Sequence, residues 1–426
     1  MNRFFEQTDT LYDITKRYPE TIAVFVSSGF PQMEQPAKRK TFGKTVTLKS
    51  ALALRKLNIA TFSELLIEAI RQERDMADQS LRSSDKRTAE DAIRIEGLLP
   101  CPVRIPMLEQ LDRFIKQRET EMEGQVVTNL KAASMGLDWI KEKIEKETNP
   151  DRLPDLLLSA GFDLFFDDKL MGKFKKKNVF ADETGLGHLN RDFDNSLLSL
   201  RDPRKHYSII ATVPAVFLVN KAELKGREIP KTWSDILKKE FRASVSLPIG
   251  DFDLFNAILL NIHKSFGEDG LTRMGESLML SMHPSEMVKS DRKKSDRPAV
   301  TIMPYFFTKM VRPGGIMEAI WPKDGAIISP IFMLTKRDKR DRLKGLIDFF
   351  ASVEVGELLA HKGLFPSTIP GVDNRLGPDK PFRWIGWDYI YQHNIGELIE
   401  SCHLIFNRSL SEEKLVGTDF KMEKEN

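Results

Sequence analysis

The chain has 426 residues, of which 41% are hydrophobic and 30% charged, and its formal net charge is +3. This length fits two or three globular domains of about 100 to 200 residues each, and the composition excludes a disordered or collagen-like chain. A charge so close to neutral predicts neither nucleic acid nor an anionic membrane as the main partner.

The amino terminus gives no sign of export or of a membrane anchor. The first residues are MNRFFEQTDTLYDITKRYPETIAVF, which place polar and acidic side chains where a secretory signal would be apolar. No apolar run elsewhere approaches the length of about 20 residues that a membrane-spanning helix needs. The two cysteines, Cys101 and Cys402, have no metal-type spacing. The sequence as written therefore predicts a cytoplasmic protein without direct membrane insertion.

Residues 1–71 are predicted to form a small helical domain. Apolar residues recur at helical spacing from Leu11 to Phe25, and Pro19 interrupts the pattern. Thr47 can cap a further helix by accepting a backbone hydrogen bond. Residues 72–96 are charged and poor in large apolar side chains, which predicts a linker.

The large domain is predicted to begin with a short strand from Leu98 to Pro106, constrained by three prolines, and a helix from Met107. Further on, the apolar run from Leu153 predicts a buried strand that ends in Ser-Ala-Gly at Gly161. A ligand could approach the backbone there because no side chain is in the way. Equally, Gly161 could serve only a tight strand-to-helix turn.

A strand that crosses between two halves of the domain is predicted from Tyr207 to Asn220. Thr212 and Pro214 interrupt this apolar run where a hinge strand would bend, and the Thr212 hydroxyl could serve a bound oxyanion or carboxylate. Downstream, Asp251 begins a helical pattern. It either caps that helix or faces the ligand, where a helix amino terminus favours an anion.

Residues 298–334 are predicted to form strand, turn and strand, with a polar group at each strand end. The first apolar run carries Tyr305, and the second, from Ala326, is broken by Ser329 and Pro330. Between them a turn cluster presents Asp324. Because ligands in open α/β sheets bind at strand ends, we expect a binding site here.

Three segments of the large domain carry a resemblance to a known family. TVPAVFLVN (212–220), PKTWSDIL (230–237) and WPKDGA (321–326) resemble, in this order, the extracellular solute-binding proteins of ABC importers, and most of all their ferric-iron-type branch. The resemblance covers about residues 95–400. It implies an α/β, two-lobed, type II periplasmic-binding-protein-like fold after the small all-α domain. The implied lobe 1 spans 97–210 and 312–408 and lobe 2 spans 211–311, with a polar tail at 409–426.

The resemblance also implies that a ligand is trapped between the lobes. Adjacent tyrosines commonly hold the metal in the ferric branch, but here Phe306 follows Tyr305. Tyr305 and Asp324, the only metal candidates, make a poor ligand set for ferric iron, whereas the aromatic patch suits a small organic ligand. No cofactor is expected, and a bound metal ion or small anion stays open. The candidate ligand contacts are Ser159, Gly161, Phe162, Thr212, Pro214, Asp251, Phe252, Tyr305, Asp324 and Ser329.

In the amino-terminal domain, DITKRYPETIAVFVSSGF (13–30) followed by TLKSAL (47–52) resembles a small bacterial domain of unknown function seen in proteins of anaerobes, some of them linked to hybrid iron–sulfur cluster proteins. Related domains often carry Cys after the Gly-Phe pair, where this chain has Pro31. The chain lacks the common hydrolase, zinc, Walker and dinucleotide motifs, so we do not expect an enzyme.

The predicted function is capture of a small molecule or ion, with an ABC permease or a cytoplasmic signalling partner. One alternative is a cytoplasmic sensor that reports lobe closure through its helical domain. The other is an enzyme on the same scaffold.

Overall fold

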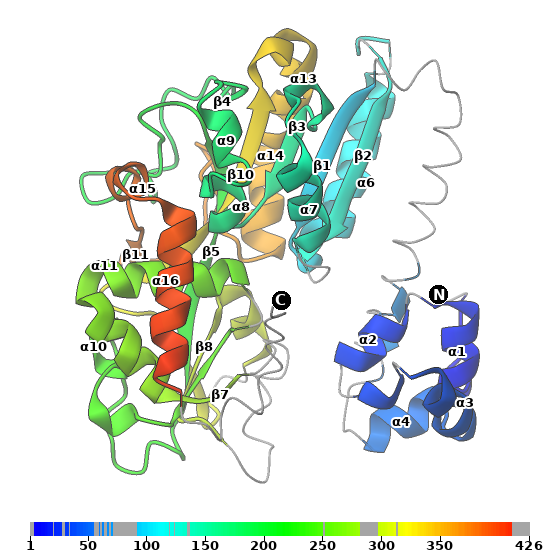
Figure 1. The fold of residues 1–426 in the computed structure, drawn as a ribbon, viewed down its shortest axis with the longest axis vertical. Helices are drawn as coiled ribbons and strands as arrows, with labels where there is room; N and C mark the ends of the chain where they lie inside the picture. The colour runs from blue at the N-terminus through cyan, green and yellow to red at the C-terminus, as the bar shows by residue number, and fades with distance from the viewer. Residues whose placement is uncertain are drawn as a thin grey trace. The chain divides into compact units, whose positions relative to one another are not determined.

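The computed structural model describes residues 4–19, 21–27, 30–33, 35–54, 59, 62–63, 66–67, 70, 92–118, 120–122, 124–133, 137–249, 252–281, 297–311 and 314–410. The chain divides into two compact units, Met1–Ala92 and Ile93–Asn426 (Figure 1). No helix within these described residues combines the length and apolar character needed to cross a membrane.

The first unit is helical, as predicted. Thr10 caps the first helix by accepting the N–H of Asp13, and the helix ends before Pro19. Its apolar core includes Phe25 and Phe30, whose rings meet edge to face with centroids 6.0 Å apart. The described elements are α1 (Leu11–Arg17), α2 (Thr21–Ser27), a 3-10 turn (Pro31–Met33), α3 (Pro36–Thr45) and α4 (Leu48–Leu54).

The second unit contains a mixed sheet that continues from one lobe into the other. The strand order is β2-β1-β3-β10-β5-β8-β6-β7, with β4 and β11 paired to β10 and β9 paired to β5. The strands are β1 (Ile93–Leu99), β2 (Val126–Ala132), β3 (Leu156–Ser159), β4 (Phe180–Ala181), β5 (Ser208–Asn220), β6 (Val245–Leu247), β7 (Leu278–Ser281), β8 (Val300–Pro304), β9 (Met317–Ile320), β10 (Ala326–Lys336) and β11 (Phe382–Arg383).

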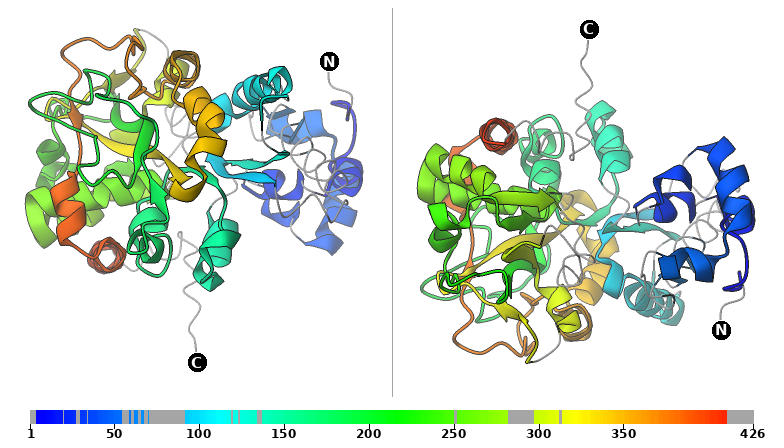
Figure 2. Two further views of the ribbon diagram at one scale, coloured as in Figure 1. Left: turned by 90° about the horizontal axis from the view of Figure 1, so that it is seen from above. Right: turned by 90° about the horizontal axis from the view of Figure 1, so that it is seen from below.

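Helices cover both faces of the lobe 1 sheet. One apolar cluster packs α6, α13 and α14 on one face, and a second cluster begins with α7 and α8 on the other face and continues into lobe 2. Figure 2 shows α6 and α13 on the opposite side of the strands from α7. The α-helices are α6 (Cys101–Gln117), α7 (Asp138–Lys146), α8 (Phe162–Phe166), α9 (Gly172–Lys175), α10 (Trp233–Ile236), α11 (Phe252–Ser277), α13 (Arg340–Phe350), α14 (Val353–Glu357), α15 (Trp387–Gln392) and α16 (Ile395–Arg408).

Tighter and wider helical turns complete the unit. The 3-10 turns are η3 (Pro150–Arg152), η4 (Lys239–Phe241), η6 (Tyr305–Met310) and η7 (Arg337–Lys339), and a π-helical turn spans Leu358–Lys362. The structure thus confirms the predicted two-lobed α/β fold preceded by a small helical domain.

Two long strands connect the lobes. The first half of β5 pairs antiparallel with β10, up to Pro214 opposite Ile328. From Ala215 onward β5 pairs instead with β8 and β9. The change of partner therefore occurs directly after Pro214, where the sequence predicted a bend.

The start of the large unit differs from the prediction. β1 begins at Ile93, inside the predicted linker, and ends at Leu99, so that only Leu98 and Leu99 of the strand predicted up to Pro106 lie in it. The remainder, from Cys101, forms the first turns of α6. Pro102 fits the first helical turn because its missing N–H has no helical acceptor there. The strand in fact ends before Pro100, and the prolines that were expected within it lie at and inside the start of the helix.

The lobe boundaries also differ, because α16 does not pack within lobe 1 alone. Near its start, a Cβ on Gly396 would lie 2.6 Å from Cγ of Asp167 in lobe 1. Near its end, the Phe406 ring meets that of Phe255 in α11 of lobe 2, with centroids 5.2 Å apart. Figure 1 shows α16 running alongside both lobes.

Candidate functional site

The strand directions make the loops of the two lobes face each other. β5 runs from lobe 1 to lobe 2, so β10, antiparallel to it, runs back. β3 is antiparallel to β10 and β1 is parallel to β3, so both end toward lobe 2. β8 is antiparallel to β5 and β6 is parallel to β8, so both end toward lobe 1. The candidate site is therefore the junction of the lobes between these strand ends, here named the cleft, because α/β folds bind ligands at such positions.

The loop after β3 contributes backbone to this cleft. Gly161 has a φ of 128°, and a Cβ there would lie 2.9 Å from Oδ1 of Asp253 at the start of α11. The Ser159 hydroxyl donates to the carbonyl of Ala160 at 2.7 Å. Phe162 is fully buried against Trp384, with ring centroids 5.6 Å apart. Gly161 thus combines a tight turn with a close approach to lobe 2, and Phe162 packs in the core.

The hinge strands carry two buried hydroxyls, at Thr212 opposite Pro330 and at Ser329 opposite Val213, which the alternation of side chains directs to opposite faces of the sheet. The Thr212 hydroxyl lies 3.4 Å from the carbonyl of Pro366, to which it donates. Ser329 pairs with Val213 on β5 and is 1% exposed. Its hydroxyl has no hydrogen-bond partner in the part of the chain that the structure describes. Because buried polar groups are nearly always satisfied, this oxygen is suited to a water or ligand that arrives at the hinge.

Tyr305 lies in a different element from the one predicted. β8 ends at Pro304, and Tyr305-Phe306-Phe307 begins the 3-10 turn η6. The Tyr305 ring packs edge to face against Trp321, with centroids 5.1 Å apart. The aromatic group predicted to cover a ligand is therefore packed, in part, against the protein itself.

The Asp324 carboxylate is engaged by structural contacts. Its oxygens accept the backbone N–H of Trp233 at 3.2 Å, and one of them pairs with Arg383 at 3.0 Å. Burial raises the pKa of Asp324, although the Trp233 N–H and the Arg383 charge oppose this shift. The Trp233 indole donates to the carbonyl of Gly325 at 2.9 Å. Asp324 thus joins the turn before β10 to the start of α10.

The remaining two candidates, Asp251 and Phe252, lie where α11 starts in the sequence, and neither side chain is described. Asp251 lies outside the described residues, and Phe252 begins α11 without a described side chain. Across the described ranges, no group of three His, Cys, Asp or Glu side chains is placed to hold a metal ion.

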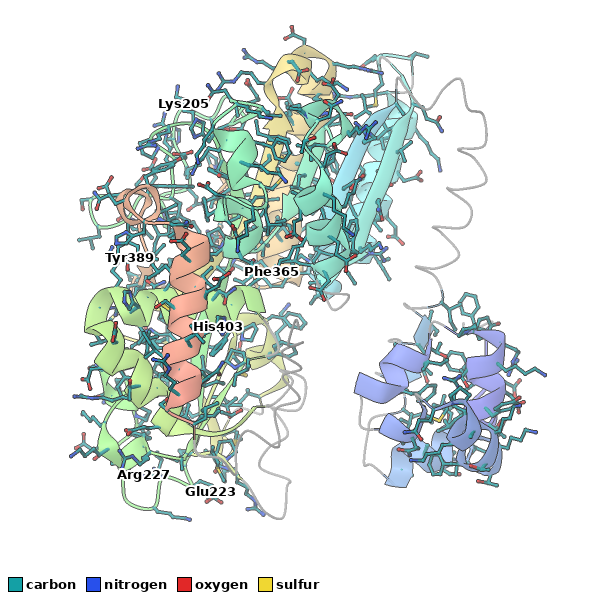
Figure 3. All side chains as sticks on the ribbon, in the orientation of Figure 1. Lys205, Glu223, Arg227, Phe365, Tyr389 and His403 are labelled. Carbon is teal, nitrogen blue, oxygen red and sulfur yellow. The ribbon has the colours of Figure 1, made fainter. Side chains whose placement is uncertain are left out.

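Sequence reasoning missed a contact between the lobes. Lys309 in η6 donates from Nζ to the carbonyl of Lys362 at 2.7 Å and to that of His361 at 3.2 Å. Beside it, Phe306 lies nearly parallel to Phe365, which Figure 3 labels where the two lobes meet. No local pattern could have shown these contacts, because the partners, at the end of the π-helical turn and in the loop after it, are distant in sequence.

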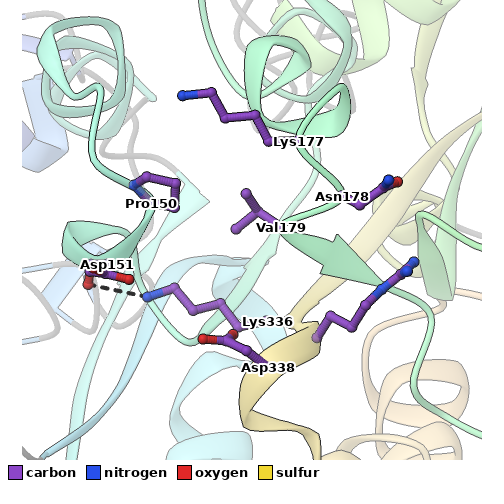
Figure 4. Close-up of a pocket in the computed structure, with 8 residues that line it drawn as sticks. Pro150, Asp151, Lys177, Asn178, Val179, Lys336 and Asp338 are labelled. Carbon is purple, nitrogen blue, oxygen red and sulfur yellow. Dashed lines mark hydrogen bonds between the residues drawn. The ribbon is translucent and has the colours of Figure 1, made fainter.

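A cavity of about 330 Å³ lies at the edge of lobe 1 away from the cleft (Figure 4). Lys336 ends β10 there, is 2% exposed, and donates to the carbonyl of Asp151 at 3.2 Å. Because β3 begins at this edge and ends at the cleft, the cavity is not part of the candidate site. Its lining is Pro150, Asp151, Lys177, Asn178, Val179, Lys336, Arg337 and Asp338.

Comparison with known families gives two matches. Residues 151–393 match the model of the bacterial extracellular solute-binding proteins, which is more than half of the chain. Residues 6–62 match a domain of unknown function, and nothing links it to hybrid-cluster proteins. The first family is described as extracellular, which gives the predicted cytoplasmic placement no support. No curated protein matches the chain in sequence.

Solved structures share the fold of the second unit at low identity. The ferric binding protein from Campylobacter jejuni is 13% identical, over 74% of this chain and 99% of that one, with a TM-score of 0.53. A Trichodesmium protein, solved with iron and citrate ligands, is 11% identical over 75% and 99%, with a TM-score of 0.53. An ABC transporter structure from Clostridium perfringens is 13% identical over 75% and 100%, also with a TM-score of 0.53.

Proposed function

The chain belongs to the family of bacterial extracellular solute-binding proteins, and from that premise we propose that it captures a small ligand between its lobes by rotation about β5 and β10. The observation that carries the proposal is the opposed direction of the strands, which brings the loops after β3 and β8 to the same cleft. Among the described strands, β5 and β10 are the two that pair in both lobes, so a few residues around Pro214 can absorb the rotation.

The mechanism needs no bond chemistry. A ligand that touches both lobes binds the closed arrangement more tightly than the open one and shifts the population toward it. In the ligand contacts that we propose, the hydroxyl of Ser329 comes first, because no described residue is its hydrogen-bond partner. The backbone around Gly161 comes second, because Asp253 and Leu137 already lie close to it. A permease of an ABC importer is the partner that such capture serves.

The ligand class that we propose is a small organic anion rather than a bare ferric ion. Ferric iron needs several hard oxygen ligands, whereas this chain offers Tyr305 and an Asp324 already held by Trp233 and Arg383. An organic acid brings its own oxygens, which backbone N–H groups and hydroxyls can bind. A metal chelated by such an acid would fit the same site.

The test is native mass spectrometry of the purified full chain, followed by thermal shifts with citrate, ferric citrate, phosphate and ferric chloride. A ligand that binds only the folded state raises stability by RT ln(1 + [L]/Kd). We expect a shift with the carboxylate, reduced in Ser329→Ala. Thr335→Val is the matched control, because this hydroxyl is also buried on β10 without a partner among the described atoms, but at the far end of lobe 1. No co-purified molecule and no shift with any probe would refute the proposal.

A further inference from the structure

The lobes touch at a second place beside the hinge, between η6 of lobe 2 and the loop after the π-helical turn of lobe 1. The rings of Phe306 and Phe365 are inclined by 18° with centroids 6.2 Å apart. Phe306 also packs against the apolar cluster that α6, α13 and α14 form in lobe 1. Phe306, which lies in the turn that directly follows β8 of lobe 2, therefore covers part of the apolar surface of lobe 1.

Lys309 adds a polar contact from the same turn. Its ammonium donates to the carbonyls of His361 and Lys362, at 3.2 and 2.7 Å. These carbonyls end the π-helical turn, where backbone acceptors lack partners and carry partial negative charge. A cation at such an end is stabilised. Partial burial has the opposite effect on the ammonium and lowers the pKa of Lys309. Lys309 thus caps a helical end that belongs to the other lobe.

We propose that Phe306 and Lys309 form a latch that holds the lobes closed in the absence of ligand; the proposal rests on the proposed function of capture by lobe rotation. Phe306 and Lys309 move with lobe 2, whereas Phe365 and the carbonyls that Lys309 caps move with lobe 1. Rotation that parts the strand ends must therefore break or slide both contacts. The latch makes these two residues determinants of affinity, because a protein already closed spends less of the ligand's binding free energy on closure.

The control residue is the neighbour of the latch. Phe307 lies in the same turn and touches the Phe306 ring edge to face at 5.2 Å, but it packs against the lobe 2 cluster around Val216 and Met303. Phe307→Ala therefore removes a ring of equal size without removing a contact between lobes. Lys309→Arg is the conservative variant, since it keeps a cation at the carbonyls.

The experiment measures lobe separation in the ligand-free full chain by double electron–electron resonance. Nitroxide labels are placed at Lys146→Cys in α7 and Lys239→Cys in η4, both exposed, in a parent that carries Cys101→Ser and Cys402→Ala so that no native thiol is labelled. Native mass spectrometry confirms that no ligand is bound. We expect one short-distance population in the labelled parent. Phe306→Ala with Lys309→Met should lower the closed-to-open ratio by about tenfold, and Lys309→Met alone by less. Phe307→Ala and Lys309→Arg should resemble the parent.

Two outcomes would overturn the latch. One is a parent that is already open or broadly distributed; the other is a double variant with the parent's distances, which would show that other contacts, such as those of α16, hold the lobes. Neither outcome bears on whether a ligand binds, which the thermal shifts decide. Conversely, a chain that binds none of the probes can still show the latch, so the two proposals fail separately.

Discussion

The ion cluster at the far edge of lobe 1 gives a quantitative prediction for Asp155→Asn. Asp155 is fully buried and accepts the N–H of Arg94 at 2.8 Å. Its other oxygen lies 2.9 Å from Nζ of Lys339 and 3.3 Å from Nζ of Lys336. The Lys336 ammonium is itself buried, so the substitution would leave it beside a neutral amide.

The magnitude follows from the cost of one unpaired buried charge. Removing one partner of a buried ion pair costs about 3–5 kcal/mol. The substituted amide can still accept the Arg94 N–H, and burial already lowers the pKa of Lys336, which reduces the cost of leaving its charge unpaired. We therefore expect about 3 kcal/mol, at the lower end of that range. Adding Lys336→Met replaces the pair by an apolar contact and should bring stability back to within about 1 kcal/mol of the parent.

The assay is denaturant unfolding at pH 7, followed by tryptophan fluorescence. All five tryptophans, Trp139, Trp233, Trp321, Trp384 and Trp387, lie in the second unit, so the signal reports on that unit alone. A loss below about 1 kcal/mol for Asp155→Asn, or a double variant as unstable as the single one, would refute the reasoning.

The same cluster sets a pH dependence. Burial alone would raise the pKa of Asp155, but the Arg94 N–H and the two lysines hold it below the unfolded value of 3.8. The stabilisation is therefore complete above pH 3.8 and is lost as the pH falls through the lower folded value. Asp155→Asn should remove this acid-induced step in the fluorescence assay, and a step that persists in the variant would contradict the assignment.

Three further substitutions test other parts of the unit. Gly161→Ala should cost about 1–3 kcal/mol in the fluorescence assay, because its φ is 128° and the new Cβ meets Asp253; unchanged stability would show that the loop has room. Burial lowers the pKa of His403, whose Nε2 donates to Asn256, so the folded protein should lose stability as the pH falls below the unfolded value of 6.5. His403→Gln should reduce this dependence of stability on pH. An unchanged dependence in the variant would show that another group is responsible. Asp324→Asn should cost about 1 kcal/mol through the loss of its ion pair and leave the ligand-induced thermal shift intact, whereas a lost shift at unchanged stability would make it a ligand contact.

Local sequence signals located the parts of the fold that depend on neighbouring residues. A bend was predicted at Thr212 and Pro214 because proline cannot donate to the hydrogen-bonded ladder, and β5 changes its pairing partner directly after Pro214. The capping box at Thr232 is a local signal that was not used: the Thr232 hydroxyl accepts the N–H of Asp235, and the Asp235 carboxylate accepts the N–H of Thr232. Such features are readable without knowing the tertiary structure.

The candidate site was less predictable because its contacts join distant segments. The turn that holds Asp324 was expected, but its partner Trp233 precedes it by most of lobe 2, and only the folded chain brings them together. Tyr305 was expected on a strand because the apolar run continues to Phe307, yet β8 ends at Pro304. Apolar periodicity does not distinguish a strand from a short 3-10 turn that packs on the same core.

The position of α16 bears on the order in which the protein can fold during synthesis. α11 belongs to the middle of the chain, but Phe255 on its surface is covered by Phe406, and Asn256 accepts from His403, near the carboxyl end. The core of lobe 1 is likewise incomplete until β10 and α13 have been synthesised, and these elements follow those of lobe 2 in the chain. Neither lobe can therefore complete its core while the other is still missing, and the nascent chain must keep apolar surface exposed until its last helix emerges.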